Sequence, residues 1–126
     1  KAIDVANNIA TTYDPVTIVI APGTYIEDNS AGPLVIHSEG ITIIGDSSST
    51  VTFIPNTPEN DFLMVTQAIH ISNATLISSE PMATGIVFAS EELSTLNNLK
   101  IINFETGVEF SSTASSYVCE SCTFIN

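Results

Sequence analysis

The sequence predicts an all-β fold in which short parallel strands stack into a solenoid, and two recurring apolar phrases are the basis of this prediction. The first phrase has five residues and occurs as VTIVI (16–20), ITIIG (41–45), ATLIS (74–78), LKIIN (99–103) and CTFIN (122–126). The second follows it at a nearly constant distance, in STVTFIP (49–55), TGIVFAS (84–90) and TGVEFSS (106–112). Phrases that recur in phase, with variable loops between them, indicate stacked structural repeats.

Before the first phrase, residues 1–12 carry apolar side chains at helical spacing, at Ala2, Ile3, Ala6, Ile9 and Ala10. This spacing predicts a short amphipathic helix. Such a helix would cap the open N-terminal end of the solenoid and protect its edge strand from non-native pairing.

Apolar and polar residues alternate along the first phrase, as expected for a strand that is buried on one side. Its first and third residues should point inward, while the second, which is usually threonine, should point to solvent. If the phrases stack, each inward position forms a column across the coils. The two expected columns are Val16, Ile41, Ala74, Leu99 and Cys122, and Ile18, Ile43, Leu76, Ile101 and Phe124.

The second phrase alternates in the same way and would stack Phe53, Phe88 and Phe110 along the axis of the solenoid. The third side of each coil is less regular. Its candidate strands are residues 34–36, 62–65, 93–96 and 117–119.

The coils therefore occupy residues 16–126, within a single domain of residues 1–126 whose 44% hydrophobic content is enough for a continuous core. The last copy of the first phrase ends at Asn126 and would leave an uncovered sheet edge, which natural proteins avoid. We therefore expect this chain to be a fragment of a longer β-helix.

Charge restricts the partners. Fourteen acidic residues against Lys1 and Lys100 give a net charge of −12. Phosphate backbones are bound through Lys and Arg, so nucleic acid is not an expected partner. No apolar run approaches the roughly 20 residues that span a bilayer, and membrane insertion is not expected either.

Two segments, IVIAPGTYIE (18–27) and GITIIGDSSSTVTFIP (40–55), resemble the opening coils of the pectin lyase-like superfamily, and they are most similar to pectin methylesterases. Gly23, Tyr25 and Glu27 match a Gly-x-Tyr-x-Glu motif, and Ile43, Gly45 and Asp46 match an Ile-x-Gly-Asp turn. The resemblance implies a right-handed parallel β-helix, here of about four to five coils. Gly23 and Gly45 would serve tight turns, with Tyr25 packed beneath them.

The same resemblance implies what an esterase site would need. Pectin methylesterases use two aspartates, a glutamine and an arginine in motifs resembling QDTL, DFIFG and LGRPW, and none of these motifs occurs here. We therefore predict no catalytic residue, no metal site and no cofactor. Asp46, Glu59 and Asp61 could bind calcium only if their loops converged, and solvated loop acids are the preferred interpretation.

Two polar features near the C-terminus have structural interpretations. Asn103 and Asn126 occupy equivalent turn positions, and the resemblance implies asparagine side chains that hydrogen-bond from coil to coil. Cys119 and Cys122 form a CxxC pair, which can indicate redox chemistry or half of a metal site. We interpret Cys122 as a small core residue. A disulfide would require the two Cα atoms to lie within about 7 Å.

The fourth residues of the five first phrases are all aliphatic, although strict alternation turns them outward. Either the strands bend so that these side chains pack under loops, or the stripe contacts a neighbouring subunit. The residues of this possible interface are Val19, Ile44, Ile77, Ile102 and Ile125.

Together these features favour a non-catalytic structural or recognition module of a larger surface protein, such as a virion fibre, spike or capsid-associated protein, at an extracellular or virion surface. Its expected partners are copies of itself or other subunits of an assembly, with glycans as a further class. The alternative is a carbohydrate-active enzyme, of pectin esterase or lyase type, whose catalytic coils lie beyond residue 126.

Overall fold

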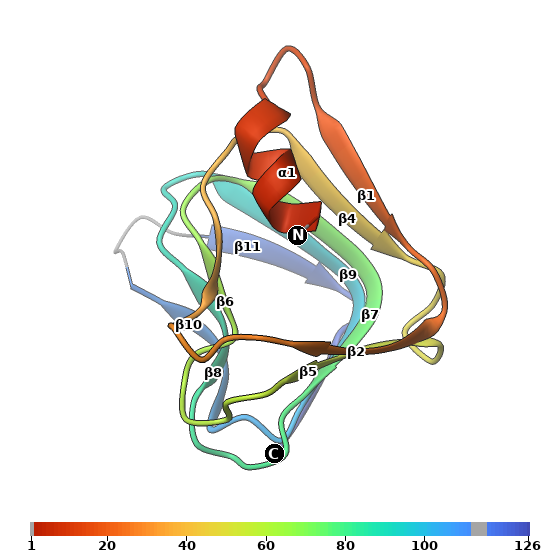
Figure 1. The fold of residues 1–126 in the computed structure, drawn as a ribbon, viewed down its shortest axis with the longest axis vertical. Coiled ribbons are helices and arrows are strands. Elements are labelled where there is room, and N and C mark those ends of the chain that lie inside the picture. The colour runs from red at the N-terminus through yellow and green to blue at the C-terminus, as the bar shows by residue number, and fades with distance from the viewer. Residues whose placement is uncertain (1, 112–115) are drawn as a thin grey trace.

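A computed structural model describes residues 2–111 and 116–126 of the chain. Lys1, which the predicted helix included, and Ser112, at the end of the second phrase, lie outside these residues. The chain winds as a right-handed parallel β-helix of about four turns with a short N-terminal helix, which confirms the predicted fold class (Figure 1). The elements are α1 (Ala2–Ile9), β1 (Val16–Ile20), β2 (Gly23–Glu27), β3 (Leu34–Ile36), β4 (Ile41–Gly45), β5 (Val51–Pro55), β6 (Leu63–Val65), β7 (Ile69–Ile77), β8 (Thr84–Phe88), β9 (Leu93–Ile102), β10 (Thr106–Phe110), β11 (Ser116–Glu120) and β12 (Thr123–Ile125).

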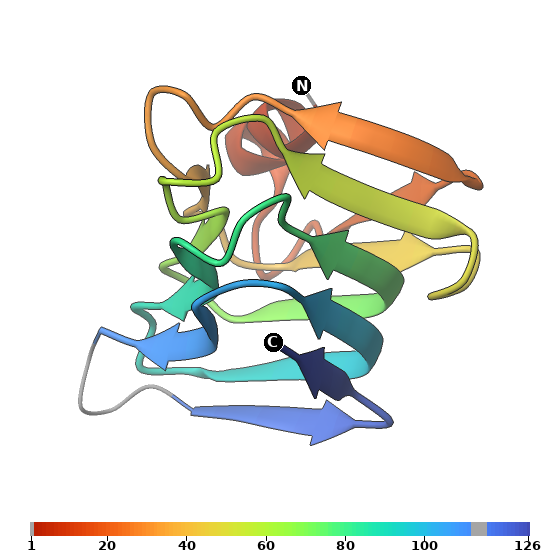
Figure 2. The same ribbon diagram turned by 90° about the horizontal axis from the view of Figure 1, so that it is seen from below.

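The strands lie on three faces, and every pair of neighbours is parallel (Figure 2). The first face carries β1, β4, the first half of β7, the first half of β9, and β11. The second face carries β2, β5, the second halves of β7 and β9, and β12. The third face carries β3, β6, β8 and β10. Because β7 and β9 continue around the corner, the first two faces form one sheet.

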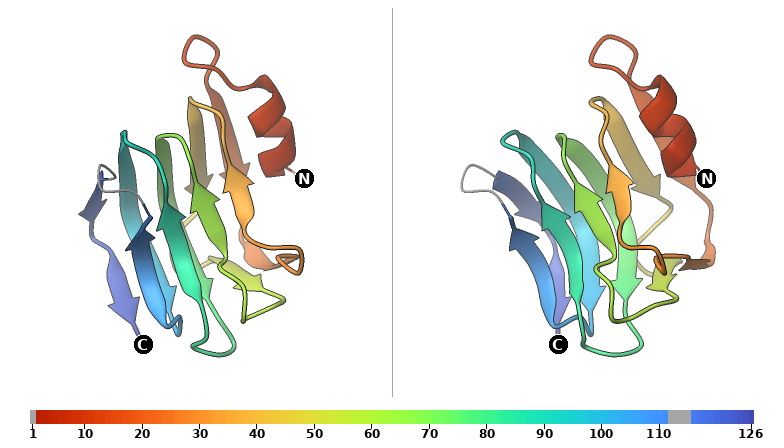
Figure 3. Two further views of the ribbon diagram at one scale, coloured as in Figure 1. Left: turned by 90° about the vertical axis from the view of Figure 1, so that its left-hand side faces the viewer. Right: turned by 60° about the vertical axis from the view of Figure 1, so that its left-hand side comes forward.

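Helix α1 lies across the N-terminal end of the coils (Figure 3). It buries Ala6 against the core, and Ala10 just after the helix is buried as well. The Asn7 side chain attaches the helix to the first coil, since its amide donates to the carbonyl of Val35 (2.7 Å) and its oxygen accepts from the backbone amide of His37 (3.0 Å). The predicted cap is present, although the helix ends at Ile9 rather than at residue 12.

The predicted columns are wrong in their register. The strand ITIIG does not pair with ATLIS, because Ile41 and Ile43 of β4 lie beside Ile69 and Ile71 in the first half of β7. The segment ATLI instead pairs with β5, with Thr75 beside Thr52 and Leu76 beside Phe53. The first phrase therefore occupies the first face in β1 and β4, and the second face in β7, β9 and β12. The same apolar pattern fits both faces, and the sequence alone did not distinguish them.

The predicted aromatic stack is confirmed for Phe88 and Phe110 and is wrong for Phe53, for the same reason. Phe53 lies on the second face and packs on Tyr25, with ring centroids 5.5 Å apart. Phe88 and Phe110 do stack, at 6.0 Å, on the third face, and Tyr117 lies 5.5 Å from Phe88. The core therefore contains two separate aromatic clusters.

Two of the four segments predicted for the third side are there, as β3 and β6. The other two, residues 93–96 and 117–119, lie in β9 and β11 on the first face. The third face at these coils is formed by β8 and β10, whose sequences were assigned to the second phrase.

A buried asparagine joins the first coil to the loop that follows β5. Asn29 is fully buried, and its side-chain amide donates to the carbonyls of Thr57 (2.9 Å) and Asn60 (3.1 Å). Its side-chain oxygen accepts from the backbone amide of Thr57 (2.9 Å). One buried side chain thus joins three backbone groups of the loop to the first coil.

We predict that Asn29→Ala lowers the free energy of unfolding by about 2–4 kcal/mol, because a fully buried side chain loses its three hydrogen bonds to the loop. Urea titration followed by circular dichroism measures this change. Asn8→Ala, at an exposed position of α1, is the matched control and should change stability by less than about 0.5 kcal/mol. Equal losses in the two variants would contradict this role of Asn29.

Glycine is required at position 45 because the end of β4 lies very close to the backbone of Asn73. It is buried at the end of β4, and a Cβ atom there would lie 2.0 Å from the carbonyl oxygen of Asn73. Gly45 is not among the described residues with positive φ, so the backbone freedom of glycine is not used there. The reason for glycine at this position is the lack of space for a side chain, rather than the tight turn that was expected.

Gly45→Ala should destabilise the fold by about 3 kcal/mol, because the new methyl group meets backbone atoms that cannot rotate away. Gly32→Ala is the comparison, since a Cβ atom there meets no atom within 4 Å and only the φ of +122° opposes it. Thermal unfolding of both variants measures the difference. A Gly45→Ala protein as stable as the parent would show that β4 and the corner at Asn73 are not in contact.

Candidate interaction face

The outward residues of the second face repeat the pattern Thr-x-Ile once in each coil, with Lys100 in place of threonine in the fourth. The residue between them points into the core, as the alternation of a strand requires. We call the outward set the Thr–Ile face. Its members are Thr24 and Ile26, Thr52 and Ile54, Thr75 and Ile77, Lys100 and Ile102, and Thr123 and Ile125.

The pairing of the strands aligns these residues in two straight columns. Ile26 pairs with Ile54 in the ladder of β2 and β5, and Ile77 pairs with Ile102, which pairs with Ile125. Neighbouring strands are about 4.8 Å apart, so each column spans about 19 Å. Ile26 is 71% exposed and Ile125 49% exposed, and the three isoleucines between them are partly exposed. An aliphatic row of this length is a contact surface rather than scattered exposure.

The charge of the Thr–Ile face differs from that of the whole chain. None of its ten residues is acidic, although the chain has 14 acidic residues and a net charge of −12. Its charged residue is Lys100, which is partly buried. Elsewhere exposed carboxylates occur on the outer sides of the coils, for example at Glu109 and Glu120. Like charges brought together in a contact repel, so the Thr–Ile face is the surface on which this acidic chain can approach another acidic molecule at least cost.

The five residues of the predicted stripe do not form one column. Val19 and Ile44 pair with each other on the first face, where Val19 is 76% exposed, and Ile77, Ile102 and Ile125 lie on the second face. The phrase register was wrong, as described above, so a single stripe was wrong as well. Ile26 and Ile54 were missed. The recurring tripeptide Thr-x-Ile, which does not depend on the phrase register, was the signal that would have found them.

The corner between the first and second faces limits the Thr–Ile face on one side. Thr75 is 8% exposed because the loop after β4 rests on it, and its hydroxyl donates to the carbonyl of Ser48 (2.6 Å). The Ser48 hydroxyl in turn donates to the Asn98 side chain (3.3 Å), whose amide donates to the Asn73 side chain (3.0 Å). This network holds the loop at the corner, and the isoleucine column beside it stays accessible.

The residues assigned structural roles from the sequence lie at turns and strand ends. The Tyr25 hydroxyl donates to the carbonyl of Ala21 (2.7 Å), next to Gly23, which opens β2. Asn103 has a φ of 59°, and its side chain donates to the carbonyl of Ser78 in the preceding coil (2.9 Å). Asn126 follows β12 and is exposed. A coil-to-coil pair of asparagine side chains does occur, at Asn73 and Asn98, which the sequence argument had not selected.

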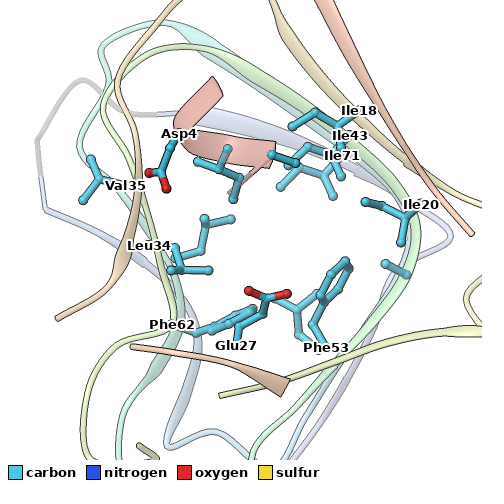
Figure 4. A pocket seen from close by; sticks show the side chains of 15 residues that line it. Asp4, Ile18, Ile20, Glu27, Leu34, Val35, Ile43, Phe53, Phe62 and Ile71 are labelled. Atoms are coloured by element: carbon cyan, nitrogen blue, oxygen red, sulfur yellow. The ribbon is translucent and has the colours of Figure 1, made fainter. Parts of the chain in front are cut away.

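Beneath α1 the first coil encloses a cavity of about 150 Å³ in the core (Figure 4). Its walls are mostly aliphatic and aromatic, with Ile18, Ile43 and Phe53 among them. The carboxylates of Asp4 on α1 and Glu27 on β2 point into it (Figure 4). Within the described ranges the Glu27 carboxylate has no hydrogen-bond partner. It therefore lies against apolar walls, which give it no hydrogen bond, while it keeps contact with solvent, since among the described residues no fully buried side-chain oxygen lacks a partner.

We predict that Glu27→Leu raises the free energy of unfolding by about 1 kcal/mol, because it removes an unpaired carboxylate from the cavity and adds apolar contacts. Chemical denaturation at pH 7 measures the gain. Glu59→Leu, at an exposed loop position, should give no gain. A loss of stability in Glu27→Leu would mean that the carboxylate makes a favourable contact in the folded protein.

The loop acids have partners of their own. Asp46 accepts a hydrogen bond from the Thr50 hydroxyl (3.1 Å), and Asp61 accepts one from the backbone amide of Thr84 (2.9 Å). In residues 2–111 and 116–126 no three His, Cys, Asp or Glu side chains gather as a metal site would require. Across the same residues no helix has the length and apolar character needed to cross a bilayer.

Comparison of the chain with protein-family models, with curated proteins and with solved structures gave no match. The fold defines its class, which is the parallel β-solenoid. The resemblance of residues 18–27 and 40–55 to pectin lyase-like proteins stays a prediction.

Proposed function

We propose that this chain is a non-catalytic structural or recognition module of a larger surface protein, such as a virion fibre, spike or capsid-associated protein, and that it assembles with a second copy of itself through the Thr–Ile face. The observation that carries the proposal is the acid-free aliphatic column of five isoleucines on a chain with a net charge of −12. The extracellular or virion location is part of the proposal and rests on the resemblance of the opening coils.

The shape of the face supports a protein partner. Its two columns run straight along the coils, so it is flat, and a second copy presents a surface of the same kind. Full burial of an isoleucine side chain contributes about 1.5–3 kcal/mol relative to exposure. Five such side chains can offset an association cost of about 4–15 kcal/mol only if most of them are covered together. The contact must therefore use the length of the column.

Electrostatics favours a second copy on this face over one on the other faces. A contact on the first or third face would bring carboxylates such as Glu120 or Glu109 close to those of the partner. Such pairs cost about 1 kcal/mol each at 4 Å in water and more when they are desolvated. The Thr–Ile face avoids this cost, and the long aliphatic stem of Lys100 adds apolar contact while its ammonium group stays hydrated.

The test is the mass of the particle in solution, measured by light scattering after size exclusion. We expect the parent chain to form an assembly that dissociates on dilution. We also expect the double variant Ile77→Glu/Ile102→Glu to be a monomer with an unchanged β-sheet circular dichroism spectrum, because two buried carboxylates oppose association. The control Val19→Glu/Ile44→Glu puts the same charges on the first face and should leave the assembly intact.

Two results would overturn the proposed assembly. One is a parent chain that stays monomeric at every concentration reached. The other is dissociation caused equally by the variants on the first and second faces, since net charge rather than the Thr–Ile face would then control association. In either case the alternative of a carbohydrate-active enzyme becomes the one to test, by assay of the full-length parent protein on pectin.

A further inference from the structure

Three corners of the solenoid have the same local geometry. They lie in successive coils between the first and second faces, and they consist of the segments Ile71–Ala74, Leu96–Leu99 and Cys119–Cys122. The third residue of each has a left-handed backbone, with φ of 61° at Asn73, 50° at Asn98 and 55° at Ser121. The CxxC motif is thus the third copy of a corner whose sequences otherwise read ISNA and LNNL.

In the first two corners, both the first and the fourth residues are buried. Leu96 and Leu99 are fully buried, and Ala74 is 1% exposed. The left-handed third residue reverses the alternation of the strand, so that two side chains three positions apart both enter the core. This geometry is a property of the corner and applies equally to the third copy.

At the third corner the two inward side chains are the cysteines. Cys119 lies beside Leu96 in the ladder of β9 and β11, and the Cys122 sulfur lies 3.6 Å from the carbonyl oxygen of the same Leu96. Both cysteines are partly buried and pack against the core. The Cys122 sulfur also lies 3.5 Å from the carbonyl oxygen of Glu120, the residue that follows Cys119. The corner therefore directs both thiols toward the same part of the core.

We infer that Cys119 and Cys122 are a site of covalent modification that closes to a disulfide when the protein meets an oxidising disulfide such as oxidised glutathione. One cysteine loses its proton, and its thiolate attacks the glutathione disulfide. The glutathione S–S bond breaks, and one glutathione leaves as a thiol after it takes up a proton. The second cysteine then loses its proton and attacks the protein sulfur of the mixed disulfide, which releases the other glutathione. Two protein thiols are oxidised and one glutathione disulfide is reduced to two thiols.

Burial and the neighbouring Cys122 thiol raise the pKa of Cys119 to about 12. Tyr117 is a further titratable group beside the pair, and Glu120, which is exposed, lies between the two cysteines in the sequence. The neighbouring β9 side chains Leu96 and Leu99 are apolar. A thiol that holds its proton reacts slowly near pH 7 and faster as the pH rises. A disulfide is easily reduced when the thiolate that reduction produces is stabilised. The protein does not stabilise the Cys119 thiolate, so we expect the disulfide to resist reduction.

Formation of this disulfide would stabilise the position of the C-terminal strand β12. β12 has three residues, all exposed, and it pairs with β9. It carries Thr123 and Ile125 of the Thr–Ile face. A bond between Cys119 and Cys122 fixes the corner from which β12 starts, and so it holds these two residues in register. The inference does not depend on the proposed function, because the corner geometry would be the same in a monomeric protein.

The experiment treats the folded chain with a mixture of reduced and oxidised glutathione at pH 8, quenches it with acid and alkylates the remaining thiols. Mass spectrometry of the peptide that spans 119–122 should show the loss of two hydrogen atoms and no alkylation. The closed form should exceed the mixed glutathione disulfide by at least about tenfold, because the second thiol is held next to the first. Cys119→Ser is the control, and it should stop at the mixed disulfide on Cys122.

Accumulation of mixed disulfide in the parent chain under the same conditions would overturn the inference. So would disulfide-linked dimers on a non-reducing gel in place of the internal bond. Circular dichroism of Cys119→Ser shows whether that control is folded. If it is not, Cys122→Ser takes its place, with the mixed disulfide then expected on Cys119.

Discussion

Each strand of a coil pairs in parallel with the equivalent segment of the next coil, and the corners between strands decide which segments are equivalent. At Asn73, Asn98 and Ser121 a single left-handed residue turns the chain, and the residue two positions before it and the residue directly after it both point toward the core. The ladder between β7 and β9 runs through two of these corners without losing its register, from His70 beside Thr95 to Ile77 beside Ile102. The core, the Thr–Ile face and the cysteine pair all follow from this alignment.

The charge distribution is a consequence of the same alignment. Threonine and isoleucine recur on the outside of the second face, where parallel strands favour β-branched side chains, and the acidic residues are left to the loops and the other faces. Glu27 is the exception, since the alternation of β2 turns it into the apolar cavity under α1 (Figure 4). A face without acidic residues on a strongly acidic solenoid concentrates association on one surface, and this links the fold to the proposed assembly.

The sequence was sufficient for most of the strand positions. The bounds of β1, β3 and β4 match the segments that predicted them, because alternation is a local property. The sequence did not predict β2 as a strand, and β8 is buried along its whole length rather than on one side. Which strands pair with each other is not determined by local sequence, because an aliphatic phrase such as ITIIG fits the first face as well as the second. Asn73 and Asn98 lie inside β7 and β9, where two polar residues in succession shift the apolar alternation by one position. The apolar phrases begin after these positions, so the corners were not part of the prediction. The Thr–Ile face depends on the corners and was therefore found only in part.

The most direct test of this alignment is a measurement of proximity between nitroxide labels in a chain that lacks its native cysteines, Cys119→Ala/Cys122→Ala. One pair of labels is placed through Ile54→Cys and Ile77→Cys, and the other through Ile44→Cys and Ile77→Cys. The structure puts Ile54 and Ile77 on adjacent strands of the second face, each directly after the paired residues Phe53 and Leu76, and Ile44 on the first face. Adjacent strands are about 4.8 Å apart. We expect strong dipolar broadening of the electron paramagnetic resonance spectrum for the first pair and much weaker broadening for the second. Strong broadening for the second pair alone would mean that the phrases stack in one column and that the Thr–Ile face does not exist.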